Sequence, residues 1–249
     1  MADIDQNNFI SKLYSEYYES IVKYCSAMLD DEYEDAELCA QEVFEQAYKD
    51  EKKLIAILRG YNFNDALFAI NTAVKGGIDV FEVAVRHGYE TQDLITLSAL
   101  KKTLGDTVIL GAGTVLGTEL LDKVIRAGAD FAVSPVVEPD VIKKCIGYGV
   151  PCIAGACTPT EIYNAYTAGA TMVKLFPAAE LGSEYLRALK APLPYIPIIA
   201  MGGITSQNIA EFSAAGATSF GISTGIFRPE EISRRNETAI LNRIKSYRF

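Results

Sequence analysis

One joint recurs through most of this chain: a helix ends at a glycine, and a short apolar strand follows at once. The joint is found around Gly77, Gly128, Gly149, Gly169 and Gly216. Gly128, Gly149 and Gly169 are 21 and 20 residues apart, and the two outer intervals, of 51 and 47 residues, each span two units. A glycine at a helix C-terminus before a buried strand is typical of a βα repeat.

The apolar runs between these joints mark the expected strands. We place strands at 54–58, 78–83, 108–111, 131–133, 151–153, 172–176, 196–200 and 219–222. Helices are expected between them at 64–75, 90–103, 117–127, 138–147, 159–168, 183–190 and 206–215, with a last helix at 229–246. Eight strands that alternate with eight helices predict an α/β fold, a (β/α)8 or TIM barrel.

Two local features bear on this expectation. In the stretch Thr158-Pro159-Thr160-Glu161, Thr158 is suited to cap a helix, Pro159 to its first turn and Glu161 to a capping box. A doubly wound open sheet is the alternative to the barrel, but its motif Gly-x-Gly-x-x-Gly does not follow the first strand.

The charge of the chain is divided unevenly. Residues 1–51 hold 14 acidic and 3 basic residues, a net charge of −11, whereas residues 52–249 hold 18 and 20, a net charge of +2. We therefore expect two units, an acidic extension at 1–50 and the barrel at 51–249. Apolar residues at helical spacing within 7–29 and 35–48 predict a helical hairpin in the extension.

The hairpin resembles the start of region 2 of the small bacterial sigma factors. The resemblance is carried by Leu13-Tyr14-Ser15-Glu16-Tyr17-Tyr18 and by Gln41-Glu42-Val43-Phe44. It stops before the part that reads promoter DNA in that family, and no second DNA-binding helix-turn-helix follows. We expect a helical cap, on the barrel or on a neighbouring subunit, rather than a working sigma factor.

Composition argues against several classes of protein. No apolar run approaches the roughly 18–20 residues of a membrane span, and the start lacks the profile of a secretory signal. Five cysteines without a Cys-x-x-Cys pair favour reduced thiols in the cytoplasm. The single histidine, His87, argues against a histidine-built metal site. Neither unit has the basic stripe of a nucleic-acid-binding protein. We expect a cytoplasmic protein that binds neither membrane nor nucleic acid.

One lysine, Lys174, lies in the middle of the expected strand 172–176. An ammonium group taken out of water is costly, so a buried lysine tends to lose its proton. The neutral amine is a nucleophile for carbonyl carbon. Considered alone, the stretch also fits a lysine on an exposed strand face or in a salt bridge.

In a TIM barrel the chemistry lies at the C-terminal ends of the strands. In chain order these ends carry Arg59, Glu82, Arg86, Thr114, Pro135, Gly155, Lys174, Gly202, Gly203, Ser223, Thr224 and Gly225. The set lacks the histidines or paired aspartates of a metal site. One lysine, one acid and two arginines suit imine chemistry on an anionic keto compound. As structural alternatives, Glu82 could pair with Lys174 and the arginines could be solvated strand ends.

With these residues the domain resembles the 2-keto-3-deoxy-6-phosphogluconate (KDPG) / 4-hydroxy-2-oxoglutarate (KHG) aldolase family. The matching stretches are Ile57-Leu58-Arg59-Gly60, Phe81-Glu82-Val83-Ala84-Val85-Arg86, Gly111-Ala112-Gly113-Thr114-Val115-Leu116, Val133-Ser134-Pro135, Thr158-Pro159-Thr160-Glu161, Val173-Lys174-Leu175-Phe176-Pro177-Ala178 and Gly202-Gly203-Ile204. Their order and spacing span nearly all of residues 54–227.

The resemblance implies a class I aldolase without a metal or other cofactor. Lys174 would form a Schiff base with the C2 ketone, and Glu82 would act as general base, leaving pyruvate and an aldehyde such as glyceraldehyde 3-phosphate. Arg86 and Thr114 match positions that hold the pyruvate carboxylate, and Pro135 and Phe176 match residues that line the pocket. Members of this family are commonly homotrimers.

The phosphate end of the family's site matches Gly202, Gly203 and the turn Ser223-Thr224-Gly225, where main-chain N–H groups and a helix N-terminus can receive an anion. The chain departs from the family at three positions after two strands. After the seventh expected strand, Met201 stands where a threonine, or sometimes a valine, faces the sugar part of the substrate in the family. After the eighth, Ser223 stands where the family has a glycine, and Thr224 stands where it has a phosphate-contacting serine.

We therefore expect cleavage of KDPG, with KHG or the corresponding 6-phosphogalactonate as alternative substrates. An inactive barrel that serves as a binding or regulatory module is an alternative of another class, but it leaves the set of Lys174, Glu82 and Arg86 without a purpose. A phosphate-binding isomerase would leave Lys174 unexplained.

Overall fold

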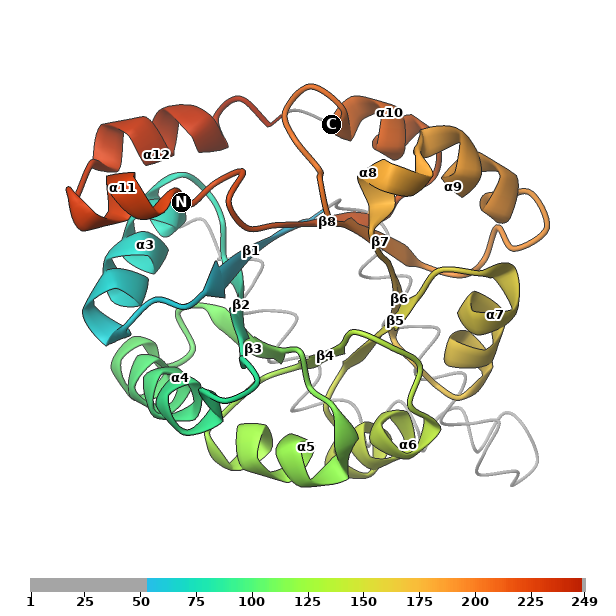
Figure 1. Ribbon diagram of the computed structural model, residues 1–249, viewed down its shortest axis with the longest axis horizontal. Coiled ribbons are helices and arrows are strands. Elements are labelled where there is room, and N and C mark those ends of the chain that lie inside the picture. The colour runs from blue at the N-terminus through green and yellow to red at the C-terminus, as the bar shows by residue number, and fades with distance from the viewer. Residues whose placement is uncertain (1–52, 248–249) are drawn as a thin grey trace, which may run out of the picture. The chain divides into compact units, whose positions relative to one another are not determined.

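The computed structural model describes residues 53–247, so the hairpin expected within residues 1–50 lies outside the described part of the chain. Eight parallel strands close into a barrel in sequence order, and Figure 1 shows the helices arranged around them. The strands are β1 (Lys53–Arg59), β2 (Val80–Ala84), β3 (Ile109–Gly113), β4 (Ala132–Ser134), β5 (Cys152–Ala156), β6 (Met172–Leu175), β7 (Ile198–Met201) and β8 (Ser219–Ile222). The (β/α)8 prediction is confirmed.

The helices follow the strands with two differences from the expected set. They are α3 (Phe63–Lys75), α4 (Glu90–Leu104), α5 (Gly117–Arg126), α6 (Pro139–Tyr148), α7 (Pro159–Thr167), α8 (Ala178–Leu181), α9 (Ser183–Lys190), α10 (Ile209–Ala214), α11 (Pro229–Ser233) and α12 (Glu237–Ile244). The short α8 was not expected. The single helix expected at 229–246 is two helices, because Arg235 adopts φ 52° and the Asn236 side chain caps α12.

Local sequence signals explain several of these boundaries. The capping box is confirmed, since the Thr158 hydroxyl accepts the Glu161 N–H and the Glu161 carboxylate accepts the Thr158 N–H. Each of the five joint glycines has a positive φ, between 64° at Gly149 and 105° at Gly216. Residues with a side chain rarely adopt this conformation, so glycine lets each helix end and the next strand begin at once.

The barrel has two separate hydrophobic layers. The larger one lies between strands and helices and includes Phe81, Leu110 and Phe220. The smaller one fills the barrel interior with Ile55, Ile57, Val80, Ala84, Phe131, Val133, Ile153, Ile199 and Met201. Phe131 fits there because its neighbour Gly111 has no side chain: a β-carbon at Gly111 would lie 2.4 Å from the Phe131 ring. The packed interior leaves the C-terminal ends of the strands as the place for a site.

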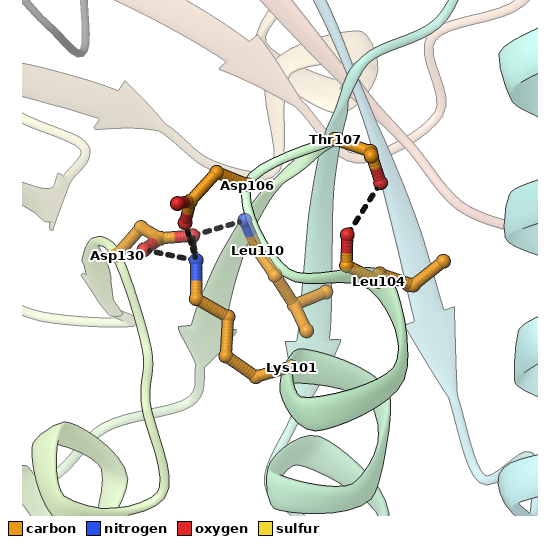
Figure 2. A network of polar contacts seen from close by, with 6 residues as sticks. All are labelled: Lys101, Leu104, Asp106, Thr107, Leu110 and Asp130. Carbon is orange, nitrogen blue, oxygen red and sulfur yellow. Dashed lines mark hydrogen bonds and ion pairs between the residues drawn. The ribbon is translucent and has the colours of Figure 1, made fainter.

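A polar network ties three elements together at the other end of the barrel (Figure 2). The Asp130 carboxylate, just before β4, accepts hydrogen bonds from the Leu110 N–H at 2.8 Å and from Lys101 Nζ at 2.8 and 2.9 Å. Lys101 comes from the last turn of α4 and also reaches Asp106, at 3.4 Å. Asp130 therefore joins α4, β3 and the start of β4.

Replacing Asp130 with alanine leaves the Leu110 N–H without its side-chain acceptor and Lys101 without its closest partner. We expect Asp130→Ala to lower the free energy of unfolding by about 1–3 kcal/mol, measured by urea denaturation. Asp106→Ala is the matched control, because the Asp106 side chain is 93% exposed and its ion pair should contribute little. Equal stability of the two variants would contradict a bracing role for Asp130.

Candidate active site

The candidate residues lie together at the C-terminal ends of the strands. Within the strands are Arg59 (the end of β1), Glu82 (β2), Lys174 (β6) and Met201 (the end of β7). In the loops that follow strands are Arg86, Thr114, Pro135, Phe176, Gly202, Gly203, Ser223 and Thr224. Because the eight strands are parallel, all these positions belong to one rim of the barrel.

Glu82 is the buried acid of this rim, with 2% of its surface exposed. Its Oε2 atom has no hydrogen-bond partner within residues 53–247. The carboxyl group occupies space that Gly113 leaves open, since a β-carbon at Gly113 would lie 1.7 Å from Glu82 Oε1. An acceptor that is buried and unpaired is costly unless a water or a ligand completes it.

Lys174 points into the same region from β6. It is half-buried and stands in register with Gly155 on β5 and Ile199 on β7. Its Nζ atom lies 5.1 Å from the centroid of the Phe176 ring. Phe176 itself is 48% exposed, so an aromatic ring that is open to solvent stands beside the amine.

The environment shifts the pKa values of Glu82 and Lys174 toward each other. Burial raises the pKa of the Glu82 carboxyl, although the positive charges of Lys174 and Arg59 act in the opposite direction. Burial likewise lowers the pKa of the Lys174 amine, against the attraction of Glu82, and the charge of Arg59 lowers it further. The lowered pKa of Lys174 favours the neutral amine that an attack on a carbonyl requires, and the raised pKa of Glu82 favours its neutral carboxyl form.

Glu82 and Lys174 do not form an ion pair. Among the residues that the structure describes, no ion pair within 4.0 Å involves either of them. The structural alternative, a direct Glu82–Lys174 salt bridge, is therefore absent from this part of the chain. A gap of more than 4.0 Å therefore separates the amine nitrogen from the carboxyl oxygens.

The two arginines of the rim differ in their surroundings. Arg59 is exposed and makes no ion pair with any residue in 53–247. Arg86 is half-buried and bound to Asp93, which accepts hydrogen bonds from its main-chain N–H, Nε and Nη2. Arg59 thus has its whole guanidinium available to a ligand, whereas Arg86 has only part of it.

Thr114 and Pro135 shape the rim through the backbone. Thr114 follows Gly113 with φ 62°, a conformation that is rare for a β-branched residue and that clusters at functional sites. Pro135 closes over Gly155, where a β-carbon would lie 2.2 Å from the Pro135 carbonyl oxygen. Gly155 therefore brings the loop after β4 close to the strand that precedes Lys174.

The expected phosphate end consists of two neighbouring turns, after β7 and after β8. Gly202 and Gly203 have φ 88° and 74°, and a β-carbon at Gly202 would lie 2.9 Å from the Phe176 ring. Within residues 53–247, the main-chain N–H groups of Gly203, Thr224 and Gly225 have no acceptor. Unpaired N–H groups in successive turn residues are typical of an anion-binding concavity.

The turn after β8 differs from expectation in two respects. No helix begins within 223–225, because the next helix, α11, starts at Pro229, so main-chain N–H groups are the donors here. The Ser223 hydroxyl donates to the Ile57 carbonyl at 3.1 Å and therefore braces β8 against β1. Thr224 is exposed, which leaves it as the hydroxyl facing solvent in this turn.

Met201 is buried, with 1% of its surface exposed, and belongs to the barrel interior. Its side chain lies across Gly221 of β8, where a β-carbon would meet the thioether at 2.6–2.7 Å. Since Lys174 is in register with Ile199, Met201 lies two residues nearer the rim on the neighbouring strand.

Other kinds of site have little support in the described part of the chain. No group of three or more histidine, cysteine or acidic side chains in 53–247 is placed to hold a metal ion. Cys145 and Cys152 are buried free thiols, and Cys157 is a half-buried one. In the same residues, no helix has the length and apolarity needed to cross a bilayer.

Known proteins share both this sequence and this architecture. The sequence profile described as "KDPG and KHG aldolase" matches residues 45–242. The chain belongs to the KDPG and KHG aldolase family. The protein is accordingly an aldolase, a lyase that breaks a carbon–carbon bond, and the resemblance read from the sequence is confirmed.

Individual relatives of this aldolase differ in substrate. The 2-dehydro-3-deoxy-6-phosphogalactonate aldolase of Escherichia coli K12 is 34% identical over 78% of this chain and 94% of its own length. The 2-dehydro-3-deoxy-phosphogluconate aldolase of Treponema pallidum is 36% identical over 65% of this chain and 76% of its own length.

The solved structures similar to this aldolase include a native KDPGal structure, with TM-score 0.71, 34% identity and coverage of 78% of this chain and 93% of the other. A second is the KDPG aldolase of Legionella pneumophila, with TM-score 0.73, 26% identity and coverage of 82% and 98%. In that protein pyruvate was captured at low pH as a covalent carbinolamine intermediate.

Sequence reasoning missed Asp93, and it named Gly113 and Gly155 without the space that they leave for other side chains. Asp93 lies seven residues beyond Arg86 in the first turn of α4, where an acid is ordinary on helix-dipole grounds. Gly113 lies two residues beyond Gly111, and Gly155 lies two residues beyond Ile153. Because side chains two residues apart on a strand face the same side, each glycine leaves an inward-facing position open, and this is the signal that could have marked them.

Replacing Gly113 with alanine should displace the Glu82 carboxyl while leaving the barrel folded. We expect Gly113→Ala to lower aldolase turnover about 100-fold or more, because Glu82 loses its position. Gly147→Ala is the matched control, since Gly147 lies in α6 with open space around it. Turnover should be measured beside the circular dichroism spectrum of each variant; unchanged turnover in Gly113→Ala would separate Glu82 from the chemistry.

Proposed function

We propose that this aldolase cleaves a 2-keto-3-deoxy-6-phospho sugar acid through a Schiff base on Lys174. The observation that carries the proposal is a half-buried lysine whose pKa is lowered by burial, set across the barrel interior from a buried glutamate without being ion-paired to it. An amine in this state can attack a ketone, and a carboxyl group with a raised pKa can both accept and return a proton near neutral pH.

The reaction begins at C2 of the substrate. Lys174 Nζ adds to the ketone carbon to give a carbinolamine, and loss of water gives the protonated imine. The new positive charge is close to Glu82 and favours its ionised form. The Glu82 carboxylate then takes the proton of the C4 hydroxyl, directly or through a water in the gap.

Cleavage follows from this proton transfer. The C3–C4 bond breaks, its electron pair moves into the imine to form the enamine, and the C4 oxygen becomes the carbonyl of the departing aldehyde. Glu82 returns the proton to C3 of the enamine, and water hydrolyses the resulting imine to release pyruvate and free Lys174. Every proton that Glu82 takes is given back, so no further reactant is needed.

The charged ends of the substrate have separate partners in this proposal. Arg86, Thr114 and Arg59 bind the keto-acid carboxylate near β1–β3. Pro135 and Phe176 line the pocket around the amine. Gly202, Gly203, Ser223 and Thr224 receive the phosphate on main-chain N–H groups and the Thr224 hydroxyl, with Ser223 acting through its backbone, because its hydroxyl proton is donated to Ile57.

KDPG is the substrate we favour, because the family profile and the 36% identical relative in Treponema pallidum are both named for it. Its C4 epimer, the 6-phosphogalactonate compound, is the second candidate. Two observations favour the epimer. Met201 offers no hydroxyl for a hydrogen bond to the sugar part, and the relative in E. coli K12, similar over 94% of its length, is named for that compound. KHG, which has no phosphate, would leave the three unpaired N–H groups of the two turns without a purpose.

We also propose an oligomeric state, a location in the cell and a domain division for this enzyme. The family resemblance supports a homotrimer, and the cysteine content supports a location in the cytoplasm. The uneven charge supports residues 1–50 as a separate acidic extension to the aldolase barrel at 51–249. Size-exclusion chromatography with light scattering on the full chain would show the number of subunits.

Trapping with pyruvate and borohydride tests the covalent step. We expect a mass increase on the peptide that contains Lys174, because reduction fixes the imine. Glu82→Gln should still be trapped but lose turnover about 100-fold or more, since its amide cannot take the C4 proton. An adduct missing from the Lys174 peptide of the wild-type enzyme would end the proposed mechanism; wild-type turnover in Glu82→Gln would remove Glu82 from it.

Substrate choice can be tested at Met201. We expect Met201→Thr to raise the ratio of kcat/KM for KDPG over kcat/KM for its C4 epimer about tenfold, because the variant gains a hydroxyl that can hydrogen-bond the sugar part. Met201→Val is the matched control, with the same shape as threonine but no hydroxyl. An identical ratio in the two variants would show that Met201 does not face the C4 hydroxyl.

A further inference from the structure

Asp93 is one of the few buried acids in the described part of the chain, with 2% of its surface exposed. Its carboxylate accepts three hydrogen bonds from a single residue, Arg86: from the main-chain N–H at 2.8 Å, from Nε at 3.0 Å and from Nη2 at 2.8 Å. The side-chain part of this contact is the two-point pairing that a guanidinium and a carboxylate make when both are held in one plane.

Two further neighbours fix the Arg86 guanidinium. The ring of Tyr89 lies beneath it, with its centroid 4.6 Å from the Arg86 Cζ atom. Gly60, next to Arg59, approaches so closely that a β-carbon there would lie 3.0 Å from Arg86 Nη1. Tyr89 and Gly60 therefore restrict rotation of the Arg86 guanidinium, which Asp93 binds along the Nε–Nη2 edge.

The opposite edge of the guanidinium is open. Arg86 Nη1 makes no hydrogen bond to any residue in 53–247, and Nη2 has a second hydrogen beyond the one given to Asp93. These hydrogens on Nη1 and Nη2 form a second edge with two parallel donors, the pattern that a carboxylate accepts. Arg86 is 28% exposed at its side chain, so a ligand can reach this edge.

We propose that Asp93 is a positioning residue that aims the Nη1–Nη2 edge of Arg86 at the carboxylate of the keto acid. The inference rests on the proposed function, in which Arg86 binds that carboxylate. By taking the Nε–Nη2 edge and the main-chain N–H together, Asp93 fixes both the loop after β2 and the direction of the guanidinium. The substrate then meets a prearranged pair of donors instead of ordering a flexible side chain on binding.

A two-point pairing also occurs between Arg243 and Glu231, but there the Nη1–Nη2 edge is already used, because both nitrogens donate to Glu231 and Nη1 also donates to the Ile226 carbonyl. Arg235 and Asp65 form a simpler pair nearer the surface, at 2.9 Å with side chains 43% and 29% exposed, and Lys75 and Glu237 form another. Asp93 differs in binding a single arginine three times and in leaving the Nη1–Nη2 edge of that arginine unused. A buried carboxylate is costly unless such hydrogen bonds satisfy it, so the arrangement is a specific one.

The test compares two ketones on the full-length enzyme and its Asp93→Asn variant. Pyruvate carries the carboxylate that Arg86 would bind, whereas hydroxyacetone does not. We expect the pyruvate concentration for half-maximal borohydride trapping on Lys174 to rise about tenfold or more in Asp93→Asn, because Arg86 loses its fixed direction. The maximal extent of trapping, and the half-maximal concentration for hydroxyacetone, should stay unchanged.

The control variant is Asp122→Asn. Asp122 also holds a cation, since it accepts hydrogen bonds from Lys144 Nζ at 2.8 Å and the Tyr148 hydroxyl at 2.7 Å, but it lies on α5 and joins that helix to α6. It should change trapping of neither ketone. If Asp93→Asn fails to fold, Asp93→Glu keeps the charge and shifts it by one methylene, and an intermediate rise for pyruvate alone is expected.

The outcomes separate this inference from the function on which it rests. An unchanged half-maximal pyruvate concentration in Asp93→Asn, or an equal rise for both ketones, would overturn the positioning role and leave the Schiff base intact. Failure of the wild-type enzyme to form an adduct on Lys174 with pyruvate would overturn the proposed function and the positioning role together.

Discussion

The rest of this structure depends on one constraint: a carboxyl group and an amine are withdrawn from water at the rim of the same barrel. Glu82 is buried and Lys174 is half-buried, so burial opposes the charged form of both, yet they are not close enough to neutralise each other in an ion pair. Such an arrangement costs stability and persists only where the surrounding packing enforces it. Here the enforcing elements are parallel strands whose inner faces are otherwise filled with apolar side chains.

Space for these groups comes from glycine rather than from a wider barrel. Because Gly113 has no side chain, the Glu82 carboxyl can occupy the space beside it. Gly155 stands beside Lys174 in the neighbouring strand. The same device serves packing below the site, where Gly111 admits the Phe131 ring. Inward-facing glycines thus decide which layers of the barrel are hydrophobic core and which layer holds the chemistry.

The fold was predictable because its signals are local and repeated. Glycine joints, apolar runs and the cap at Thr158 each report on a few neighbouring residues, and together they give the number and order of strands. The strand ends were less predictable for a physical reason. Expected strands stopped at Gly111 and Ile153, where apolar runs stop, but β3 and β5 continue to Gly113 and Ala156 because ladder hydrogen bonds do not require apolar side chains.

The placement of the candidate residues was predictable to a similar depth. Strand ends place Glu82, Lys174 and Arg86 at one rim, since parallel strands end on the same side of the barrel. Contacts between a loop and the next helix, such as Arg86 with Asp93, leave no periodic trace in the sequence. Nor does the sequence show that the Ser223 hydroxyl donates to the Ile57 carbonyl.

The two ends of the substrate are recognised by different physical means in the proposed enzyme, and this explains where the sequence can vary. A carboxylate bound by arginine depends on side-chain identity and direction, so Arg86 requires a partner that holds it. A phosphate bound by main-chain N–H groups depends on backbone shape more than on side-chain identity, so a residue such as Thr224 can differ from the family pattern. Departures in this chain are therefore concentrated at the aldehyde half, at Met201, Ser223 and Thr224, while the pyruvate half keeps its charged set.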